Sequence, residues 1–206
     1  MTTEAELMPD QLVIATHNVK KAGEMLTILG DRFPNLKLKT LADYPHSVEP
    51  EETATSYMGN AKIKAETAAS HTSEWCLADD AGLEIDALDG APGLYSKRFA
   101  GADTPFPEKI RRILGLLDGV SEAKRTARFR CCVALAKTGE PTQIFEAICE
   151  GVIPPAPSGR GGFGYDPMFY LPELGCTMAD LTASEKHRVS HRGKVLAAFG
   201  DFWEAL

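Results

Sequence analysis

The stretch that decides the fold is Leu77-Ala78-Asp79-Asp80-Ala81-Gly82-Leu83-Glu84. It follows the apolar residues 75–76, and four carboxylates lie in the eight positions 79–86. We interpret this pattern as the end of a buried strand that presents acids to a cleft. Adjacent side chains of an extended chain point to opposite faces, so only one of Asp79 and Asp80 reaches a common ligand unless the chain turns at Gly82.

Grouped carboxylates at this place predict a site for a hard cation. Oxygen ligands and retained waters are what Mg²⁺ prefers, and Mg²⁺ usually accompanies phosphate chemistry. The pair Glu51 and Glu52 offers a further carboxylate from an acidic loop, and which of the two faces the ion stays open. A solvated acidic hairpin is the alternative for residues 77–86 taken alone.

Length and composition indicate one globular domain over residues 1–206. The chain is 44% apolar and 25% charged, which is ordinary for a protein with a substantial core. A net charge of −7 argues against a nucleic-acid polymer as partner. No apolar run approaches the roughly 20 residues of a membrane span, and residues 1–10 lack the pattern of a signal peptide. The five cysteines show no metal-binding spacing, so we expect reduced, mostly buried thiols in a cytoplasmic protein.

Hydrophobic periodicity predicts alternating strands and helices, and so a sheet with flanking helices, either α/β or α+β. The strands are expected at residues 11–15, 36–41, 125–137 and 142–153, the last two as a hairpin. The helices are expected at residues 22–29, 55–70, 107–117 and 194–205, with a short one after the capping box at 182–185.

The polar loop 16–21 is a candidate phosphate site. Open α/β sheets bind ligands at the carboxyl ends of strands, and free amides at a helix start attract anions. Lys20 and Lys21 add positive charge, although the loop has no Walker pattern. A plain polar connection with exposed lysines is the alternative.

The glycine-rich loop 159–166 is a candidate pocket for a flat ligand. Phe163 and Tyr165 offer aromatic faces, and Asp166 offers a polar contact. Hydrogen-bond donors gather soon afterwards at Lys186, Ser190, His191 and Arg192.

Eight ordered motifs together resemble the inosine/xanthosine triphosphate pyrophosphatase family over nearly the whole chain. They are Ile14-Ala15-Thr16-His17-Asn18-Val19-Lys20-Lys21, Glu51-Glu52-Thr53, Asn60-Ala61-Lys62-Ile63-Lys64-Ala65, Leu77-Ala78-Asp79-Asp80-Ala81-Gly82-Leu83, Gly90-Ala91-Pro92-Gly93-Leu94-Tyr95-Ser96, Ala127-Arg128-Phe129-Arg130, Gly162-Phe163-Gly164-Tyr165-Asp166-Pro167 and Ser190-His191-Arg192-Gly193.

The resemblance implies hydrolysis of ITP, dITP and XTP to the monophosphate and pyrophosphate, which removes these nucleotides from the pool. It also implies Mg²⁺ dependence, a homodimer, and an α/β fold whose elongated mixed central sheet carries flanking helices and two lobes around a nucleotide cleft. Asp80 is implied as catalytic acid-base and metal ligand, with Glu52 or Glu51 as a second ligand. The implied substrate contacts are Thr16, His17, Asn18, Val19, Lys20, Lys21, Lys64, Ala81, Phe163, Gly164, Tyr165, Asp166, Lys186, His191 and Arg192.

Two positions depart from the family pattern. Ala81 stands where the family commonly has Ser, and Gly59 stands where it commonly has Glu. Donors on His191 and Arg192 would favour a 6-keto purine over adenine, whereas the sequence does not show how guanine is rejected or which sugar is preferred. The alternatives are a related pyrophosphatase of other nucleoside triphosphates and a nucleotide sensor that does not hydrolyse its ligand.

Overall fold

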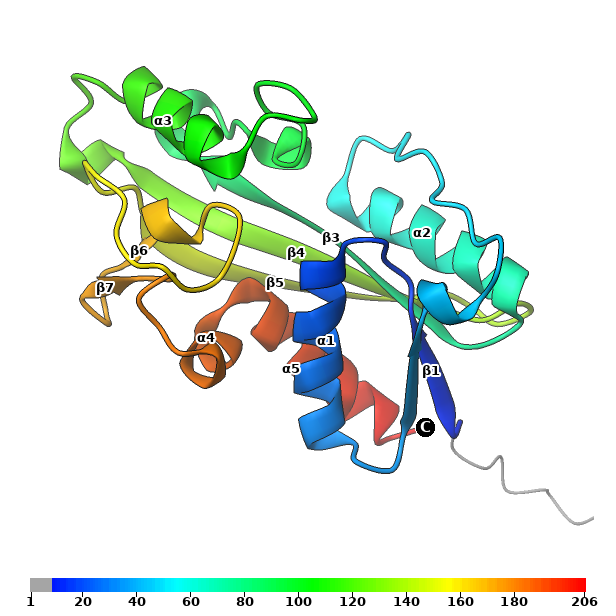
Figure 1. The fold of residues 1–206 in the computed structure, drawn as a ribbon. Coiled ribbons are helices and arrows are strands. Elements are labelled where there is room, and N and C mark those ends of the chain that lie inside the picture. Colours follow the sequence, from blue (N-terminus) through cyan, green and yellow to red (C-terminus); the bar gives the residue numbers. More distant parts are fainter. Residues whose placement is uncertain (1–8) are drawn as a thin grey trace, which may run out of the picture.

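The computed structural model describes residues 9–206, and its strands form one seven-stranded mixed sheet (Figure 1). The order across the sheet is β2-β1-β3-β4-β5-β6-β7. The first three strands in this order are parallel and the remaining pairs are antiparallel. The strands are β1 (Gln11–Ile14), β2 (Lys37–Thr40), β3 (Cys76–Ile85), β4 (Thr126–Ala136), β5 (Gln143–Val152), β6 (Tyr170–Leu171) and β7 (Cys176–Thr177).

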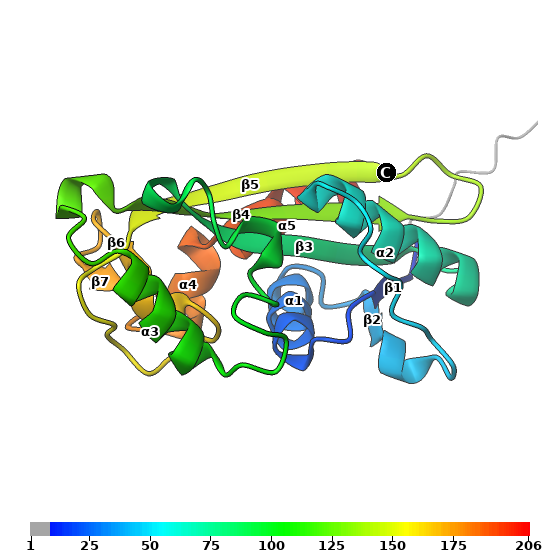
Figure 2. The same cartoon turned by 90° about the horizontal axis from the view of Figure 1, so that it is seen from above.

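Five α-helices within the described residues 9–206 flank this sheet. They are α1 (Val19–Arg32), α2 (Tyr57–Thr72), α3 (Phe106–Leu116), α4 (Ala183–Val189) and α5 (His191–Trp203). The long strands β3, β4 and β5 run the length of the molecule, with α2 at one end and α3 at the other (Figure 2). Helices α1 and α5 lie on the opposite side of the sheet from α2 (Figure 1). The predicted α/β class, mixed sheet and flanking helices are confirmed.

The core consists of three clusters because β3 and β4 send alternate side chains to opposite faces. Leu77 and Cys131 pack under α1 and α5, whereas Ala78 and Cys132 pack under α2. Toward the far end of the same strands, a third cluster that includes Leu83 packs beneath α3. The two neighbouring cysteines therefore face opposite sides of the sheet, as predicted. All five cysteines are free and four of them are buried.

The acidic stretch differs from its prediction in one respect. Strand β3 does not end at the acids but continues to Ile85 without a turn at Gly82. This glycine is required by close packing, because a Cβ atom there would collide with the Gly93 carbonyl and lie 2.6 Å from the Tyr57 hydroxyl. The solvated-hairpin alternative is also wrong, since Asp79 is 1% and Asp80 8% exposed.

Helix boundaries depart from the predictions for local reasons. Helix α1 begins at Val19 rather than near residue 22, because the side chain of Asn18 caps its first turn. Helix α5 begins at His191 rather than Lys194, because Ser190 caps it. The capping box predicted at Thr182 and Glu185 is confirmed at the start of α4.

Within residues 9–206, no helix is both long and apolar enough to cross a membrane. The expectation that residues 1–10 carry no signal peptide falls largely on residues 1–8, which lie outside the described residues.

Candidate active site

A cavity of about 350 Å³ lies over the middle of β3, and residues of the loop before α1, of all five helices and of the glycine-rich loop line it. Every residue predicted for the site lines it except His17, Val19 and Glu51, the alternative to Glu52 as metal ligand; Val19 is 84% exposed. The predicted residues on its wall are Thr16, Asn18, Lys20, Lys21, Glu52, Lys64, Asp80, Ala81, Phe163, Gly164, Tyr165, Asp166, Lys186, His191 and Arg192.

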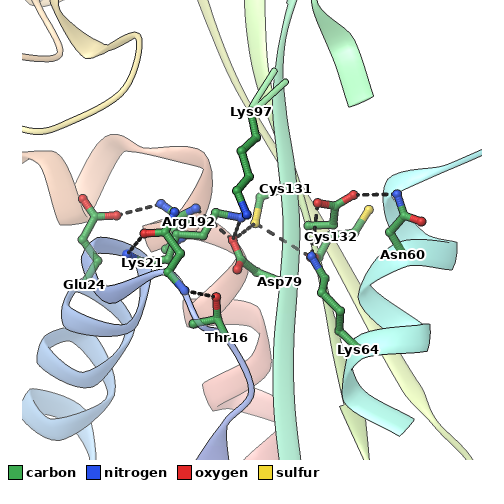
Figure 3. Close-up of polar contacts among 12 residues, drawn as sticks. Thr16, Lys21, Glu24, Asn60, Lys64, Asp79, Lys97, Cys131, Cys132 and Arg192 are labelled. Carbon is green, nitrogen blue, oxygen red and sulfur yellow. Dashed lines mark hydrogen bonds and ion pairs between the residues drawn. The ribbon is translucent and has the colours of Figure 1, made fainter. Parts of the chain in front are cut away.

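On one face of β3, Asp79 forms a buried ionic cluster (Figure 3). Its Oδ2 atom lies 3.2 Å from Lys21 Nζ and accepts a hydrogen bond of 2.8 Å from Arg192 Nη2. Burial tends to raise the pKa of Asp79, but Lys21 and Arg192 outweigh it and hold this pKa far below its usual value. Asp79 is therefore charged at neutral pH, and its contacts tie α1 and α5 to the sheet.

On the other face, Asp80 is held less tightly. Asn60 Nδ2 donates to its Oδ2 at 3.1 Å, and Lys64 Nζ donates to its Oδ1 at 3.3 Å (Figure 3). Burial raises the pKa of Asp80, and the nearby lysines do not cancel this effect. A carboxylate with a raised pKa is a better proton acceptor near neutral pH. The pKa values of the two adjacent aspartates are therefore shifted in opposite directions, that of Asp79 down and that of Asp80 up.

Of the two candidate glutamates, Glu52 is the one that faces the cavity. Lys64 Nζ donates to Glu52 Oε1 at 2.8 Å, so the same ammonium group contacts Glu52 and Asp80. Glu51 is exposed and does not line the cavity. Of the two glutamates between which the sequence could not choose, only Glu52 lines the cavity.

The departure at position 59 has a packing reason. Asn60 Oδ1 accepts a hydrogen bond of 3.0 Å from Ala54 N, which draws the loop before α2 against the helix. A Cβ atom at Gly59 would lie 2.5 Å from the Ala54 Cβ atom. Glycine at this position therefore lets the loop that carries Glu52 pack closely against α2.

The start of α1 differs from the expected anion site. Asn18 Oδ1 accepts hydrogen bonds of 3.1 Å from the backbone amides of both Lys20 and Lys21. These two amides are therefore capped by the protein itself, and the prediction of free amides is wrong for them. The side chains of Thr16, Lys20 and Lys21 still line the cavity.

At the other end of the cavity, Phe163 lies beside two cations. Lys186 Nζ is 4.5 Å from the ring centroid of Phe163, and the Arg192 guanidinium is 5.8 Å from it. Asp166 Oδ2 accepts hydrogen bonds from Lys186 Nζ at 2.6 Å and from the Phe163 amide at 2.7 Å. Asp166 therefore fixes both the loop and the lysine.

His191 stacks on Phe129 with ring centroids 4.6 Å apart. Burial and the neighbouring cations Arg192 and Lys186 lower the pKa of His191 well below its usual value, so the ring is neutral at pH 7. A neutral imidazole has one N–H donor and one acceptor. The side chain thus offers one donor rather than two.

Several residues of this site were missed from the sequence, and three of them, Glu24, Lys97 and Lys109, carry charge close to the predicted residues. Glu24 lies 2.6 Å from Lys186 Nζ and accepts a hydrogen bond of 2.7 Å from Arg192 Nη1, and both Lys97 and Lys109 line the cavity. Lys97 belongs to a basic pair next to a quoted motif, which was a usable signal. Glu24 and Lys109 carry no local signal, because each looks like a solvated helix residue until the fold is known.

The fold and the cavity define an α/β nucleotide-hydrolase class: one end is rich in lysine and carboxylate groups, and the other has an aromatic ring among fixed polar groups. The Ham1 family model matches residues 12–202, and the chain belongs to this family.

Curated relatives agree with the resemblance seen in the sequence. A protein of Geobacillus kaustophilus named dITP/XTP pyrophosphatase is 44% identical over 196 residues, which is 95% of both chains. A Listeria monocytogenes protein of the same name is 46% identical and aligns over 90% of this chain and 91% of its own. Among solved structures, a HAM1 protein from Coxiella burnetii has a TM-score of 0.86 at 36% identity, covering 95% of this chain and 99% of that one.

Proposed function

We propose that this protein hydrolyses dITP, XTP and ITP to the nucleoside monophosphate and pyrophosphate. The observation that carries the proposal is Asp80, a buried carboxylate of raised pKa at the middle of a cavity with a cationic end and an aromatic end. Relatives that align over at least 90% of this chain are named dITP/XTP pyrophosphatase, which supports dITP and XTP as substrates.

The cationic end is suited to a triphosphate. Lys20, Lys21 and Lys64 bring three ammonium groups to the cavity wall beside the Thr16 hydroxyl. Positive groups fixed before the reaction offset charge on phosphate oxygens, which is the main task of a protein in phosphoryl transfer.

Asp80 is proposed as the general base. It would orient a water molecule and accept one of its protons while the water oxygen adds to a phosphorus atom of the α–β phosphate linkage. The bond between the α and β phosphates then breaks, and its electron pair leaves with pyrophosphate. Asn60 and Lys64 hold both oxygens of Asp80, so the carboxylate keeps one orientation.

The residues present fit a divalent cation that the substrate helps to bind. Glu52 and Asp80 both lie within 3.3 Å of Lys64 Nζ, so their carboxylates are close neighbours. Among residues 9–206, no group of three or more His, Cys, Asp or Glu side chains could hold an ion alone. Two carboxylates completed by phosphate oxygens are a usual Mg²⁺ arrangement. When bound, Mg²⁺ neutralises charge on the phosphate oxygens.

The aromatic end is proposed as the base pocket. Phe163 offers a ring face, and Arg192 keeps one buried donor, Nε, without a partner among the described residues. The Nδ1 atom of His191 is likewise buried without a partner. A purine with a 6-keto oxygen can accept a hydrogen bond from such a donor, whereas the 6-amino group of adenine leaves the donor unpaired. A 6-keto purine is therefore favoured over adenine.

Single-domain organisation, pairing into a homodimer and a cytoplasmic location are proposed from the resemblance. The continuous sheet favours one domain, and light scattering of the purified protein would test the dimer.

A pyrophosphate-release assay tests the function. Rates are measured for ITP, dITP, XTP, GTP, dUTP, dTTP and ATP, with Mg²⁺ or with a chelator, and with the Asp80→Asn variant as control. We expect Mg²⁺-dependent release from the first three. Preference for a pyrimidine would identify the related pyrophosphatase, and binding without turnover would identify the sensor.

A further inference from the structure

Lys109 is a buried cation that the proposed chemistry does not use. It lies in the first turn of α3, is 1% exposed and lines the cavity. Its Nζ atom donates to the backbone carbonyl of Lys97, and no ion pair of Lys109 is found among residues 9–206. Burial lowers the pKa of its ammonium group. A lysine placed near a helix start and away from water is unfavourable, so its position requires a reason.

The segment that Lys109 contacts, residues 93–98, is named here the cleft strap. Two consecutive carbonyls of the strap accept hydrogen bonds from residues outside it. Ser96 O accepts a hydrogen bond of 2.9 Å from the Tyr165 hydroxyl, and Lys97 O accepts one from Lys109 Nζ. The Ser96 hydroxyl accepts from the Leu83 amide at 2.9 Å and donates to Gly93 O at 2.6 Å. The strap is therefore bound to β3, α3 and the glycine-rich loop at once.

The two outer contacts also support each other. Lys109 Nζ lies 5.1 Å from the ring centroid of Phe106, and the Phe106 ring packs edge-on against Tyr165 at 5.1 Å. One packed unit therefore consists of Lys109, Phe106 and Tyr165. Its two donors, the Lys109 ammonium and the Tyr165 hydroxyl, both bond to carbonyls of the strap.

The clamped backbone carries a cation to the edge of the cavity. The Lys97 side chain is 72% exposed, lines the cavity and lies 3.7 Å from Glu49 on the facing loop. A long exposed side chain has many rotamers, so the position of its backbone decides where its charge can act.

We propose that Lys109 is a positioning residue, which fixes the strap through the Lys97 carbonyl so that the Lys97 ammonium reaches a polyphosphate bound in the cavity. The inference rests on the proposed function for the nature of the ligand. Lys109 itself does not touch the ligand.

A double-mutant cycle tests the coupling without relying on turnover. The binding of inorganic tripolyphosphate is measured by calorimetry for the parent protein, Lys97→Ala, Lys109→Met and the double variant. Lys124→Met, which removes an exposed lysine, is the matched control. We expect Lys109→Met to weaken binding about fivefold to tenfold in the parent but less than about twofold in Lys97→Ala, because coupled residues are not additive. The control is expected to bind like the parent.

Additive losses, or no loss in Lys109→Met, would overturn the proposal. Thermal unfolding is recorded for each variant; if Lys109→Met does not fold, Lys109→Leu, which also removes the donor group, carries the same cycle. With dITP as substrate, we expect Lys109→Met to raise KM more than it lowers kcat. A parent protein that binds tripolyphosphate but releases no pyrophosphate would refute the proposed function while leaving the Lys109 cycle valid.

Discussion

Asp79 and Asp80 allow one substitution to be made at two adjacent positions with opposite expected results. The variants are Asp79→Asn and Asp80→Asn, and each replaces a carboxylate by an amide of nearly the same shape. Asp79 faces Lys21 and Arg192, whereas Asp80 faces Asn60 and Lys64. Each variant therefore serves as the control for the other.

Asp79→Asn is expected to lower stability. Removing one partner of a buried ion pair costs about 3–5 kcal/mol, and because Arg192 keeps Glu24 and Lys21 is partly exposed, we expect about 2–3 kcal/mol. In a chain of this length this lowers Tm by about 4–12 °C. The charged form of Asp79 stabilises the protein above the unfolded-state pKa, and this contribution is lost as pH falls toward the lower folded-state pKa. The Tm difference should therefore narrow below about pH 4.

Asp80→Asn is expected to spare stability and remove turnover. Because burial raises the pKa of Asp80, its charged form is less favourable in the folded protein than in the unfolded chain, and a neutral isostere relieves this cost. We expect Tm to stay within about 2 °C of the parent or to rise, while kcat falls by about 10²-fold or more with KM little changed.

Calorimetry in chelator and steady-state kinetics with dITP check both variants. Equal Tm values for Asp79→Asn and the parent would refute the buried ionic cluster. Turnover of Asp80→Asn within a few-fold of the parent would refute its assignment as the base.

Two further substitutions test packing and base selection. Gly82→Ala should destabilise the protein by about 1–3 kcal/mol in chemical unfolding, because its Cβ atom would collide with the Gly93 carbonyl, and an unchanged midpoint would contradict the close contact. Arg192→Ala, assayed where it remains folded, should narrow the ratio of kcat/KM for ITP over ATP, because it removes the buried donor proposed to favour the keto base. A folded variant with the parent's ratio would rule out that role.

Periodicity and capping residues were enough to predict the major helices and the long strands. The alternating faces of β3 also followed from the sequence, because neighbouring side chains in a strand must diverge. By contrast, the sequence did not predict that β3 continues past Asp79 and Asp80 to Ile85. Carboxylates in mid-strand are tolerated here only because Lys21, Lys64 and Arg192 approach from three helices, and no local pattern records such contacts.

In the candidate site, too, some residues could be predicted from the sequence and others could not. Residues in motifs, such as Lys64 and Asp80, could be named from the sequence. Glu24 could not, because its bond to Arg192 spans 168 positions. Lys109 could not either, since its partner is a backbone carbonyl.

The cavity is proposed to remove pyrophosphate from a 6-keto purine triphosphate. The most direct measurement is a chromatographic time course on an equimolar mixture of dITP and dATP with Mg²⁺. We expect dIMP and pyrophosphate to accumulate together, without dIDP, while dATP persists, with discrimination between the two nucleotides of up to roughly 10⁴. Equal consumption of both nucleotides, or formation of dIDP with orthophosphate, would contradict the proposal.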